Sequence, residues 1–341
     1  MLKMINKFKF KILPLIIVLM LLAGCFKDGN ASGAVVSNIN APVVTGQNIE
    51  TAKAENRYDK IFDPSKDEGK LVIRFLYNAT GTDTKSGDST IIKTPDGKVM
   101  LIDGSAPETA NQIKRYLDAL GIKKIDAIVA SHPHIDHIGG LTQIIYQYQV
   151  DKLYRSAVEY PTSITKNFDK AVKDRGIETV VLKDGISFDF GVTKIDVYNP
   201  IEEITYPQNY PDNSTAFLND NSVVLKMTYK DSSVLLPGDL YIGGERSVLD
   251  RHEKDIQADI LKIPHHGADT SSSSTFIKAV QPKVAVAMTD QMASLSVYNS
   301  CRKNNVKAYI TAVDGCVKVV ADGTKEYEVI TEKDRTSDFL K

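Results

Sequence analysis

The 341-residue chain contains no tryptophan, only three cysteines and only six histidines. Neither charge sign is in excess, since 42 lysines and arginines stand against 43 aspartates and glutamates. With 42% hydrophobic and 25% charged residues, the composition is ordinary for a soluble globular protein. It argues against a disordered chain and against a multi-span membrane protein. A chain of this length can bury a sizeable core, as one large domain or two small ones.

Acidic residues are absent from residues 1–24, where four lysines precede an apolar stretch from Ile12 to Ala23. This stretch is shorter than the roughly 20 residues of a membrane span but matches the apolar region of a signal peptide. It ends in Leu22-Ala23-Gly24-Cys25, which resembles a bacterial lipoprotein lipobox. The resemblance implies a signal peptide over residues 1–24 and lipidation of Cys25. We therefore expect an exported protein, lipid-anchored at the outer face of the bacterial cell membrane. A plain N-terminal anchor helix is the alternative.

Cleavage before Cys25 would remove four lysines and no acidic residue, which changes the formal net charge from −1 to −5. The bulk charge of a protein that binds nucleic acid through a basic surface is therefore not expected, although a local basic groove is compatible with it. Two other cysteines, Cys301 and Cys316, remain. Export would permit a disulfide between them, and two buried thiols are the equal alternative.

The composition and the hydrophobic pattern of the expected mature chain change along its length. Residues 25–69 are rich in small and polar residues without periodicity, which predicts a flexible tether. From residue 70 strand-like apolar runs alternate with amphipathic segments, and 331–341 form a tail. Two similar β-rich halves with outer helices favour an α/β fold over 70–330, a four-layer αββα sandwich. We expect strands at 71–77, 89–93, 99–102, 125–130, 179–182, 186–190, 194–198, 222–229, 233–236, 260–263, 284–288 and 308–311, helices at about 107–120, from 140, 162–174, 244–252, 274–280 and 297–305, and a long loop at 199–221.

Three of the six histidines fall in the window His132-Pro133-His134-Ile135-Asp136-His137, between a predicted strand and a predicted helix. His132 and His134 are two residues apart, so an extended backbone points both to one side. Asp136 and His137 then begin a turn. The loop can present three imidazoles and one carboxylate to a single cleft, a donor set that suits zinc, manganese or iron. Isolated surface or core histidines are a poor alternative, because so dense a cluster would repel itself when protonated.

This window resembles the signature motif of the metallo-β-lactamase-fold hydrolase superfamily. The resemblance implies an αββα sandwich with two divalent metal ions, zinc or manganese, in a cleft between its halves. His132 and His134 would serve the first ion, and Asp136 and His137 the second. A later Asp would bridge both ions, and Asp239 in Leu236-Pro237-Gly238-Asp239 fits that position.

The same resemblance implies a later histidine on the second ion. Pro264-His265-His266-Gly267 follows a predicted strand and offers two. We assign His265 to the metal, as the first residue beyond the strand, and His266 to its support or to protonation of the leaving group, with the reverse order open. A third imidazole for the first ion is missing, since no histidine lies between His137 and His252. This departure argues against β-lactam hydrolysis.

Several short strings, in order, resemble one branch of the superfamily, the hydrolase domain of the late competence protein ComEC. In that branch an Asn-rich loop replaces the missing histidine, so Asn219 or Asn221 would face the first ion or the substrate, with turn chemistry as the alternative. The resemblance spans about 70–325. It rests on Gly87-Asp88-Ser89, Pro95-Asp96-Gly97, Leu101-Ile102-Asp103-Gly104, Leu218-Asn219-Asp220-Asn221, Pro237-Gly238-Asp239 and His265-His266-Gly267.

Two further residues are candidates for support of the site or substrate. Asp103 follows a predicted strand and can hold a metal-bound histidine by its far ring nitrogen, or it is a turn residue. Ser271 lies in a run of hydroxyl residues before a predicted helix. Hydroxyls and free N–H groups there can hold a phosphate, or they form an ordinary helix N-cap.

These interpretations define a ComEC-like metal-dependent hydrolase, with Asp136 and His266 as catalytic residues. Two ions would lower the pKa of a shared water and give a metal-activated hydroxide. We expect a small-molecule or nucleic-acid phosphodiester as substrate and predict no protein partner. A lactone, thioester or amide hydrolase is the second hypothesis, and a non-enzymatic lipoprotein that binds an extracellular ligand or DNA through a degenerate site is the third.

Overall fold

The computed structural model describes residues 57–80 and 87–333 of the chain. The expected signal peptide, the lipidation site Cys25, residues 25–56 of the expected tether and residues 334–341 of the tail lie outside the described residues. Within the described ranges, no helix is both long enough and apolar enough to span a bilayer.

The first of two large β-sheets has eight strands in the order β17-β16-β1-β2-β3-β5-β7-β8. Strands β3, β5, β7 and β8 run parallel to one another, and all other neighbouring pairs in this sheet are antiparallel. The strands are β1 (Leu71–Phe75), β2 (Thr90–Lys93), β3 (Val99–Ile102), β5 (Ala127–Ala130), β7 (Lys152–Arg155), β8 (Glu178–Val181), β16 (Val317–Ala321) and β17 (Tyr327–Thr331).

The second sheet has seven strands in the order β15-β14-β13-β12-β11-β10-β9. Strands β12, β13, β14 and β15 run parallel to one another, whereas each neighbouring pair from β9 to β12 is antiparallel. Its strands are β9 (Ser187–Phe190), β10 (Thr193–Asn199), β11 (Val224–Tyr229), β12 (Ser232–Leu236), β13 (Ile260–Lys262), β14 (Val284–Ala287) and β15 (Lys307–Ile310), and a separate pair is formed by β4 (Lys124–Ile125) and β6 (Gln149–Val150).

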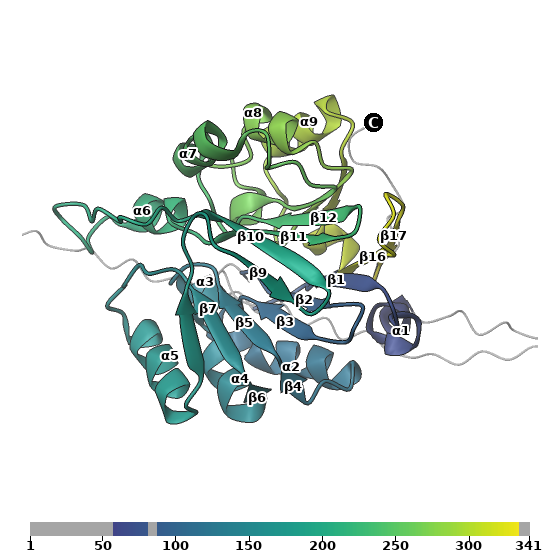
Figure 1. Ribbon diagram of the computed structural model, residues 1–341, viewed down its shortest axis with the longest axis horizontal. Coiled ribbons are helices and arrows are strands. Elements are labelled where there is room, and N and C mark those ends of the chain that lie inside the picture. The colour runs from purple at the N-terminus through teal and green to yellow at the C-terminus, as the bar shows by residue number, and fades with distance from the viewer. Residues whose placement is uncertain (1–56, 81–86, 334–341) are drawn as a thin grey trace, which may run out of the picture. The chain divides into compact units, whose positions relative to one another are not determined.

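Helices lie on the outer side of each sheet (Figure 1). Helices α2, α4 and α5 share an apolar core with the first sheet, and α7, α8 and α9 share another with the second. The helices are α1 (Arg57–Phe62), η1 (Pro64–Lys66), η2 (Pro107–Thr109), α2 (Ala110–Ala119), α3 (Ile135–Ile138), α4 (Leu141–Gln147), α5 (Ser163–Asp174), α6 (Thr215–Asp220), α7 (Ile242–His252), η3 (Pro264–Gly267), α8 (Ser274–Val280), α9 (Leu295–Lys303) and α10 (Thr311–Asp314).

The alternation of side chains along the strands explains the layers. On β3, Met100 and Ile102 belong to the core between the two sheets, whereas Val99 and Leu101 belong to the core under the helices. Successive residues of a strand point to opposite faces, so a strand covered on both faces reads as a continuous apolar run. The expected four-layer αββα sandwich is confirmed.

The parallel strands bring the polar loops of both halves to the same edge of the molecule. Asp103 follows β3 and the histidine window follows β5 in the first sheet, while Asp239 follows β12 and His266 follows β13 in the second. In α/β sheets, ligands bind beyond the carboxyl ends of parallel strands. The topology therefore brings residues that are far apart in sequence together between the two sheets.

Most of the expected elements are confirmed to within a few residues. The expectation of a long loop at 199–221 is wrong in its last part, where α6 forms. No strand was expected at β7, a short strand with polar residues at three of its four positions, at β16, whose five residues are all buried, or at the edge strand β17. Strands β7 and β17 are largely half-exposed and bury few side chains, so their pattern is weak.

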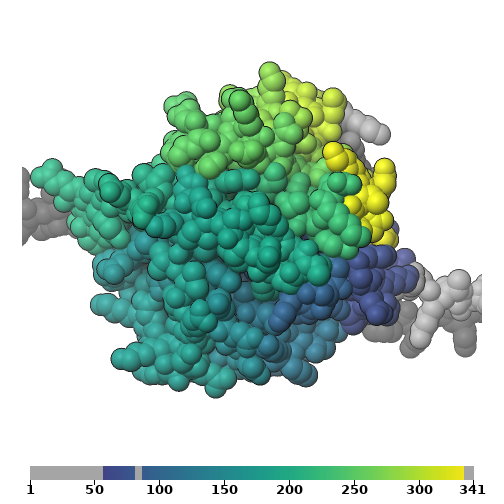
Figure 2. Space-filling view, in the orientation of Figure 1, coloured from purple at the N-terminus to yellow at the C-terminus, as the bar shows by residue number. Residues whose placement is uncertain are grey.

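The expected boundary at residue 70 is too late, because residues 57–69 belong to the folded domain. In α1, Ile61 and Phe62 are buried. The guanidinium of Arg74 on β1 donates to the carbonyl of Ile61 at 2.6 Å and to Asp67 at 2.5 Å, and the Lys318 ammonium lies 2.8 Å from Asp67. Figures 1 and 2 show α1 beside the C-terminal strands at the surface. The segment taken as tether thus closes one end of the first sheet.

The two cysteines of the domain are free and buried. Cys301 lies in the core under the second sheet, and Cys316 lies in the core under the first. The structure therefore has two buried thiols and no disulfide between Cys301 and Cys316.

Asp67 is the acidic partner of two buried cations, and its loss should be costly. In the variant Asp67→Asn, Arg74 and Lys318 would be left buried without a balancing charge, so we expect a loss of about 3 kcal/mol or more in the free energy of unfolding, measured by urea titration. The matched control is Glu178→Gln, which removes an exposed partner of Lys152 and should cost less than about 1 kcal/mol. A loss in Asp67→Asn no larger than in the control would contradict this.

Candidate metal centre

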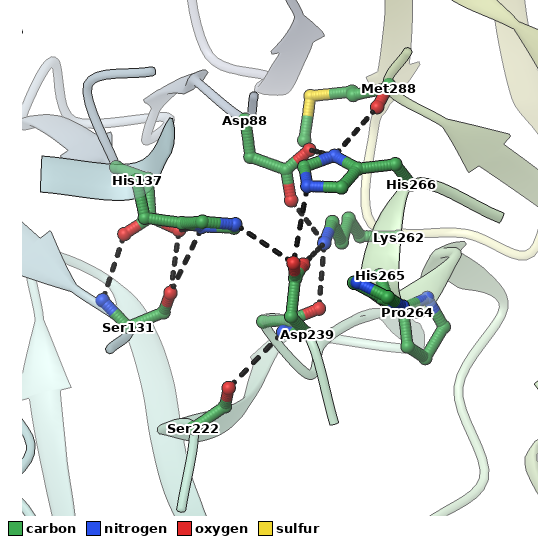
Figure 3. A network of polar contacts seen from close by, with 12 residues as sticks. Asp88, Ser131, His137, Ser222, Asp239, Lys262, Pro264, His265, His266 and Met288 are labelled. Carbon is green, nitrogen blue, oxygen red and sulfur yellow. Dashed lines mark hydrogen bonds and ion pairs between the residues drawn. The ribbon is translucent and has the colours of Figure 1, made fainter. Parts of the chain in front are cut away.

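The cleft holds a compact group of four donors: Asp136, His137, Asp239 and His266. One ligand atom from each lies within 4.8 Å of all the others. The Nε2 atoms of His137 and His266 lie 3.0 and 3.1 Å from Oδ2 of Asp239. His266 Nε2 is also 3.4 Å from Oδ2 of Asp136. Figure 3 shows both rings near the Asp239 carboxylate, with His137 at the left and His266 above it.

The geometry of these contacts suits a cation better than mutual hydrogen bonds. Nε2 of His137 and Nε2 of His266 are buried, yet neither completes a hydrogen bond with a described residue, despite the short distances to Asp239. Donor atoms that face a common point without being aligned on one another leave that point for an ion. Two imidazoles and two carboxylates form a mixed nitrogen and oxygen set that fits zinc or manganese.

A carboxylate stands behind each imidazole of this group. Asp103 Oδ2 lies 2.8 Å from Nδ1 of His137. Asp88 Oδ1 lies 3.0 Å from Nδ1 of His266, which is hydrogen-bonded to the carbonyl of Met288, also at 3.0 Å. Asp103 is itself held by the backbone N–H and hydroxyl of Ser131, at 2.8 and 2.7 Å. Such partners fix the ring tautomer and orientation, and they raise the basicity of the inward-facing nitrogen. The expected supporting role of Asp103 agrees with this geometry.

The same carboxylates set the charge of the imidazoles. Burial opposes protonation of His137, but Asp239 and Asp103 outweigh it and raise its pKa to about 10. Burial is likewise outweighed at His266, where Asp239 and Asp88 raise the pKa well above the ordinary value. In the absence of a cation, both rings therefore carry a proton at neutral pH and supply the positive charge that the carboxylates require.

His132 and His134 form a different pair beside this group. Nε2 of His132 lies 2.8 Å from Nδ1 of His134, and a hydroxyl, Ser131 Oγ, lies 3.0 Å from Nδ1 of His132. Burial is the main cause that lowers the pKa of both rings, so both are neutral at pH 7. Among the described residues, no carboxylate comes within ion-pair distance of either ring.

The structure brings His266, and not His265, into the group of possible metal donors, which is the reverse of the order that we expected. His265 and His266 have φ of +48° and +54°, so the chain turns tightly between Pro264 and Gly267 and the two rings diverge. His265 hydrogen-bonds to Thr270 Oγ1 at 2.6 Å and packs near the Tyr241 ring. His266 joins the donor group instead. Its Nδ1 contacts the carbonyl of Met288 at 3.0 Å, and its Nε2 faces the carboxylates of Asp239 and Asp136.

Of the two candidate asparagines, Asn219 lies near the histidines and Asn221 has a local backbone contact. Asn219 is 1% exposed, and it lies beside His134, whose pKa its amide acts to raise against the effect of burial. Asn221 ends α6, and its amide donates to the carbonyl of Phe217 at 2.8 Å. Of the two, Asn219 is therefore the candidate for the site, and Asn221 has the turn chemistry that was the alternative.

Ser271 and its neighbours already have hydrogen-bond partners within the chain. Its hydroxyl donates to the carbonyl of Pro264 at 2.9 Å, within the loop that carries the paired histidines. The backbone N–H groups of Ser272 and Ser273 donate to the buried carboxylate of Glu245. Ser273 caps α8 by accepting from Phe276. The chain itself thus satisfies the donors that were candidates for a phosphate, and the helix-cap alternative holds.

Two residues of the site were missed from the sequence: Lys262 and Asp88. The Lys262 ammonium, 3% exposed, contacts Asp88, lies 3.1 Å from Oδ1 of Asp239 and donates to the Gly238 carbonyl at 2.6 Å. Asp88 follows Gly87, whose φ is +74°; a Cβ there would lie 1.9 Å from the Asp136 carbonyl oxygen. A lysine inside the apolar strand β13, and a glycine before an aspartate, were the available signals.

Cation binding should displace protons and therefore strengthen as the pH rises. In the cation-free protein His137 and His266 are protonated at neutral pH, and a metal must replace those two protons. We expect the affinity for Mn²⁺ to rise up to about 100-fold per pH unit between pH 6 and 8, with release of about two protons per ion, measured by calorimetry in buffers of different ionisation enthalpy. The variant His265→Ala should behave like the wild type. An affinity that does not change with pH would contradict this assignment.

Residues 82–197 match the family model described as the metallo-beta-lactamase superfamily. ComE operon protein 3 of Bacillus subtilis is 28% identical over 60% of this chain and 27% of its own length. Competence protein ComA of Neisseria gonorrhoeae is 25% identical over 69% of this chain and 31% of its own length. The chain thus spans about a quarter to a third of these relatives.

Among solved structures, the metallo-beta-lactamase fold protein YhfI from Bacillus subtilis is 12% identical, with a TM-score of 0.47, over 71% of this chain and 96% of its own. The signature His132–His137 lies inside the matched region, and the sandwich has the arrangement that the motif implies. These findings support the assignment of this chain to the metallo-beta-lactamase superfamily, in the branch of the ComEC-type competence proteins.

Proposed function

We propose that this chain is a metal-dependent phosphodiesterase, exported and tethered to the membrane by lipid. The observation that carries the enzymatic part is the convergence of Asp136, His137, Asp239 and His266, with two imidazole nitrogens that face a common point. The superfamily and this donor group support a metal-dependent hydrolase in general. The preference for a phosphodiester bond, the use of two ions, and their identity as zinc or manganese are our proposal.

The charge of the centre favours a phosphodiester among the substrates of such hydrolases. Asp136 and Asp239 offer two carboxylates to the cation, and Asp88 and Asp103 stand behind the rings. Divalent cations bound there would activate a water and polarise a phosphoryl oxygen, which carries more negative charge than the carbonyl of an ester or amide. The similarity to the ComEC-type proteins points in the same direction.

The protein's own groups hold this arrangement and exclude water from its rear. The carboxylate of Asp103 occupies Nδ1 of His137, and the carbonyl of Met288, with Asp88 beside it, occupies Nδ1 of His266, so Nε2 of each ring faces Asp239. Lys262 fixes Oδ1 of Asp239, which leaves Oδ2 toward the rings. The neutral pair His132 and His134, beside the donor group, can accept a hydrogen bond or a proton. These positions are set before a substrate arrives, which lowers the cost of reaching the transition state.

We expect the purified protein, supplied with Mn²⁺ or Zn²⁺, to hydrolyse bis-p-nitrophenyl phosphate. Loss of a cation ligand should remove most of the activity, so Asp136→Ala and His266→Ala should each reduce kcat/KM by about 100-fold or more, measured by release of p-nitrophenolate. The neighbouring variant His265→Ala, outside the donor group, should stay within a few-fold of the wild type.

Equal values of kcat/KM in the wild type, Asp136→Ala and His266→Ala would contradict the proposal of metal-dependent phosphodiester hydrolysis. A parallel panel of a lactone, a thioester and an amide substrate separates the other hydrolase chemistry. Activity on that panel alone, lost in the same variants, would keep the site and replace the substrate. Binding of DNA or another ligand with no turnover of any substrate would favour the non-enzymatic lipoprotein.

The membrane tether can be tested independently of the chemistry. If Cys25 is the lipidation site, cells that express the full chain should incorporate labelled palmitate into it, and the protein should sediment with the membranes. Cys25→Ser should abolish the label and shift the protein away from the membrane fraction. Cys301→Ser is the matched control, because that thiol is buried in the domain. Equal labelling in Cys25→Ser and the wild type would overturn the assignment.

A further inference from the structure

We propose that this chain binds the nucleobase of a short, single-stranded phosphodiester on an aromatic cluster beside the metal centre. The cluster consists of Tyr160, Tyr206, Tyr210 and Phe217. The proposal rests on the proposed function, because it names the substrate class of the same centre. It adds a binding site made of residues that are not cation ligands.

Two segments that are distant in sequence form the cluster. Tyr160 lies between β7 and α5, whereas Tyr206 and Tyr210 lie in the loop before α6, and Phe217 lies in α6 itself. The ring centroid of Tyr210 is 4.9 Å from that of Tyr206, 5.5 Å from that of Phe217 and 6.4 Å from that of Tyr160. Figure 1 shows α6 and the loop before it at the left of the molecule, above α5. These centroid distances are those of rings in contact, so the cluster is continuous.

The cluster adjoins the imidazoles beside the donor group. The ring of Tyr160 lies edge-on to that of His134, with the centroids 6.2 Å apart, and the His134 ring is in turn 4.7 Å from that of His132. The two segments are also joined at this point, because the Ser156 hydroxyl donates to the carbonyl of Asn221 at 3.2 Å. A group attached to a phosphate at the metal centre therefore meets the aromatic cluster next to His134.

The backbone of a single residue holds two of the rings. The N–H of Glu159 donates to Oη of Tyr206 at 3.0 Å, and the hydroxyl of Tyr210 donates to the carbonyl of Glu159. Because both hydroxyls have backbone partners, the ring surfaces are what remains for a ligand, and Tyr206 is 41% exposed. Rings that are fixed before a ligand arrives lose little freedom when it binds.

The three tyrosines of the cluster line a cavity of about 710 Å³, a size that is ordinary for a ligand pocket. The charged residues of its wall comprise two cations and two anions: Arg155, Lys166, Glu159 and Asp169. Arg155 is paired with Asp169 at 2.5 Å. Since the opposite charges of the wall are equal in number, the cavity favours an uncharged ring over a second phosphate group.

A nucleobase is the uncharged planar group that phosphodiesters carry most generally. Proteins bind single strands by stacking successive bases on aromatic side chains, because every base has a flat π-face. In a duplex those faces are covered by neighbouring bases, and an enzyme must unpair a base before it can reach it. A wall without net positive charge also gives a long polyanion little attraction. The cavity therefore fits a base of a short, unpaired strand.

A matched pair of substrates tests the proposal: a deoxyadenosine dinucleotide and the same sugar-phosphate backbone with both bases absent. With Mn²⁺ supplied, the wild type should have a kcat/KM about tenfold or more higher on the dinucleotide. Tyr206→Leu keeps an apolar side chain but removes the ring, so this ratio should fall by about tenfold, chiefly through KM on the dinucleotide. Tyr160→Leu should lower the ratio in the same way.

Two further variants separate stacking from a general structural effect. Tyr206→Phe keeps the ring and loses only the contact with Glu159, so the ratio should stay within about threefold of the wild type. Tyr146→Leu is the matched control, because Tyr146 is a tyrosine of similar exposure, 45%, on α4. The ratio in this variant should equal that of the wild type.

Binding can be followed without turnover. A dinucleotide that contains 2-aminopurine should lose fluorescence when it is added to the metal-free full chain, because stacking on an aromatic ring quenches this base. The quenching should persist in Tyr206→Phe and Tyr146→Leu and should weaken by about tenfold in apparent affinity in Tyr206→Leu.

Equal kcat/KM on the dinucleotide and the abasic backbone in the wild type would overturn the proposal, as would a ratio that neither leucine variant of the cluster alters. A higher kcat/KM on a base-paired duplex than on the dinucleotide would also overturn it. In all three cases hydrolysis itself would uphold the proposed function. Quenching that depends on Tyr206, without hydrolysis of any phosphodiester, would instead refute the proposed function and keep the stacking site.

Discussion

Buried negative charge at the edge between the two sheets is the constraint that organises the centre. Asp88, Asp103 and Asp239 are each at most 2% exposed, and Asp136 lies beside them. An isolated buried carboxylate costs several kcal/mol, so each must be paired, protonated or bound to a cation. Lys262 provides one permanent positive charge. The imidazoles of His137 and His266 provide two more when protonated, and those are the positions at which a divalent ion can replace protons.

The topology explains why such different segments meet. Each half of the sandwich contributes strands that run parallel at the cleft, and an acidic residue follows a strand in each half: Asp103 after β3 and Asp239 after β12. Asp103 contacts Nδ1 of His137, and Asp239 faces Nε2 of the same ring. The two aspartates thus have different places in the site: Asp103 contacts Nδ1 of His137, and Asp239 belongs to the group of possible metal donors.

Much of this arrangement could be predicted from the sequence because it depends on local pattern. The apolar runs predicted most of the strands, and the dense histidine window predicted the part of the site that contains Asp136 and His137. The choice between His265 and His266 could not be predicted, because it depends on a left-handed turn that sends neighbouring rings in different directions. Lys262 and Asp88 were missed for another reason. Their importance lies in an ion pair across 174 positions of sequence, and the string Gly87-Asp88-Ser89 does not show that its aspartate meets a buried lysine. The start of the domain was missed because α1 is short and polar on its outer face.

The permanent charge of Lys262 bears on how the centre behaves when no ion is bound. If protons alone balanced the carboxylates, deprotonation of His137 and His266 would leave buried anions without a partner, and the loops would separate. The ammonium instead ties Asp88 to Asp239, so the support behind His266 and the carboxylate in front of it move as one unit. The donors are thereby preformed, and a cation exchanges for protons rather than assembling the site. Preformed donors lose little entropy on binding, which favours affinity at the position that Lys262 supports.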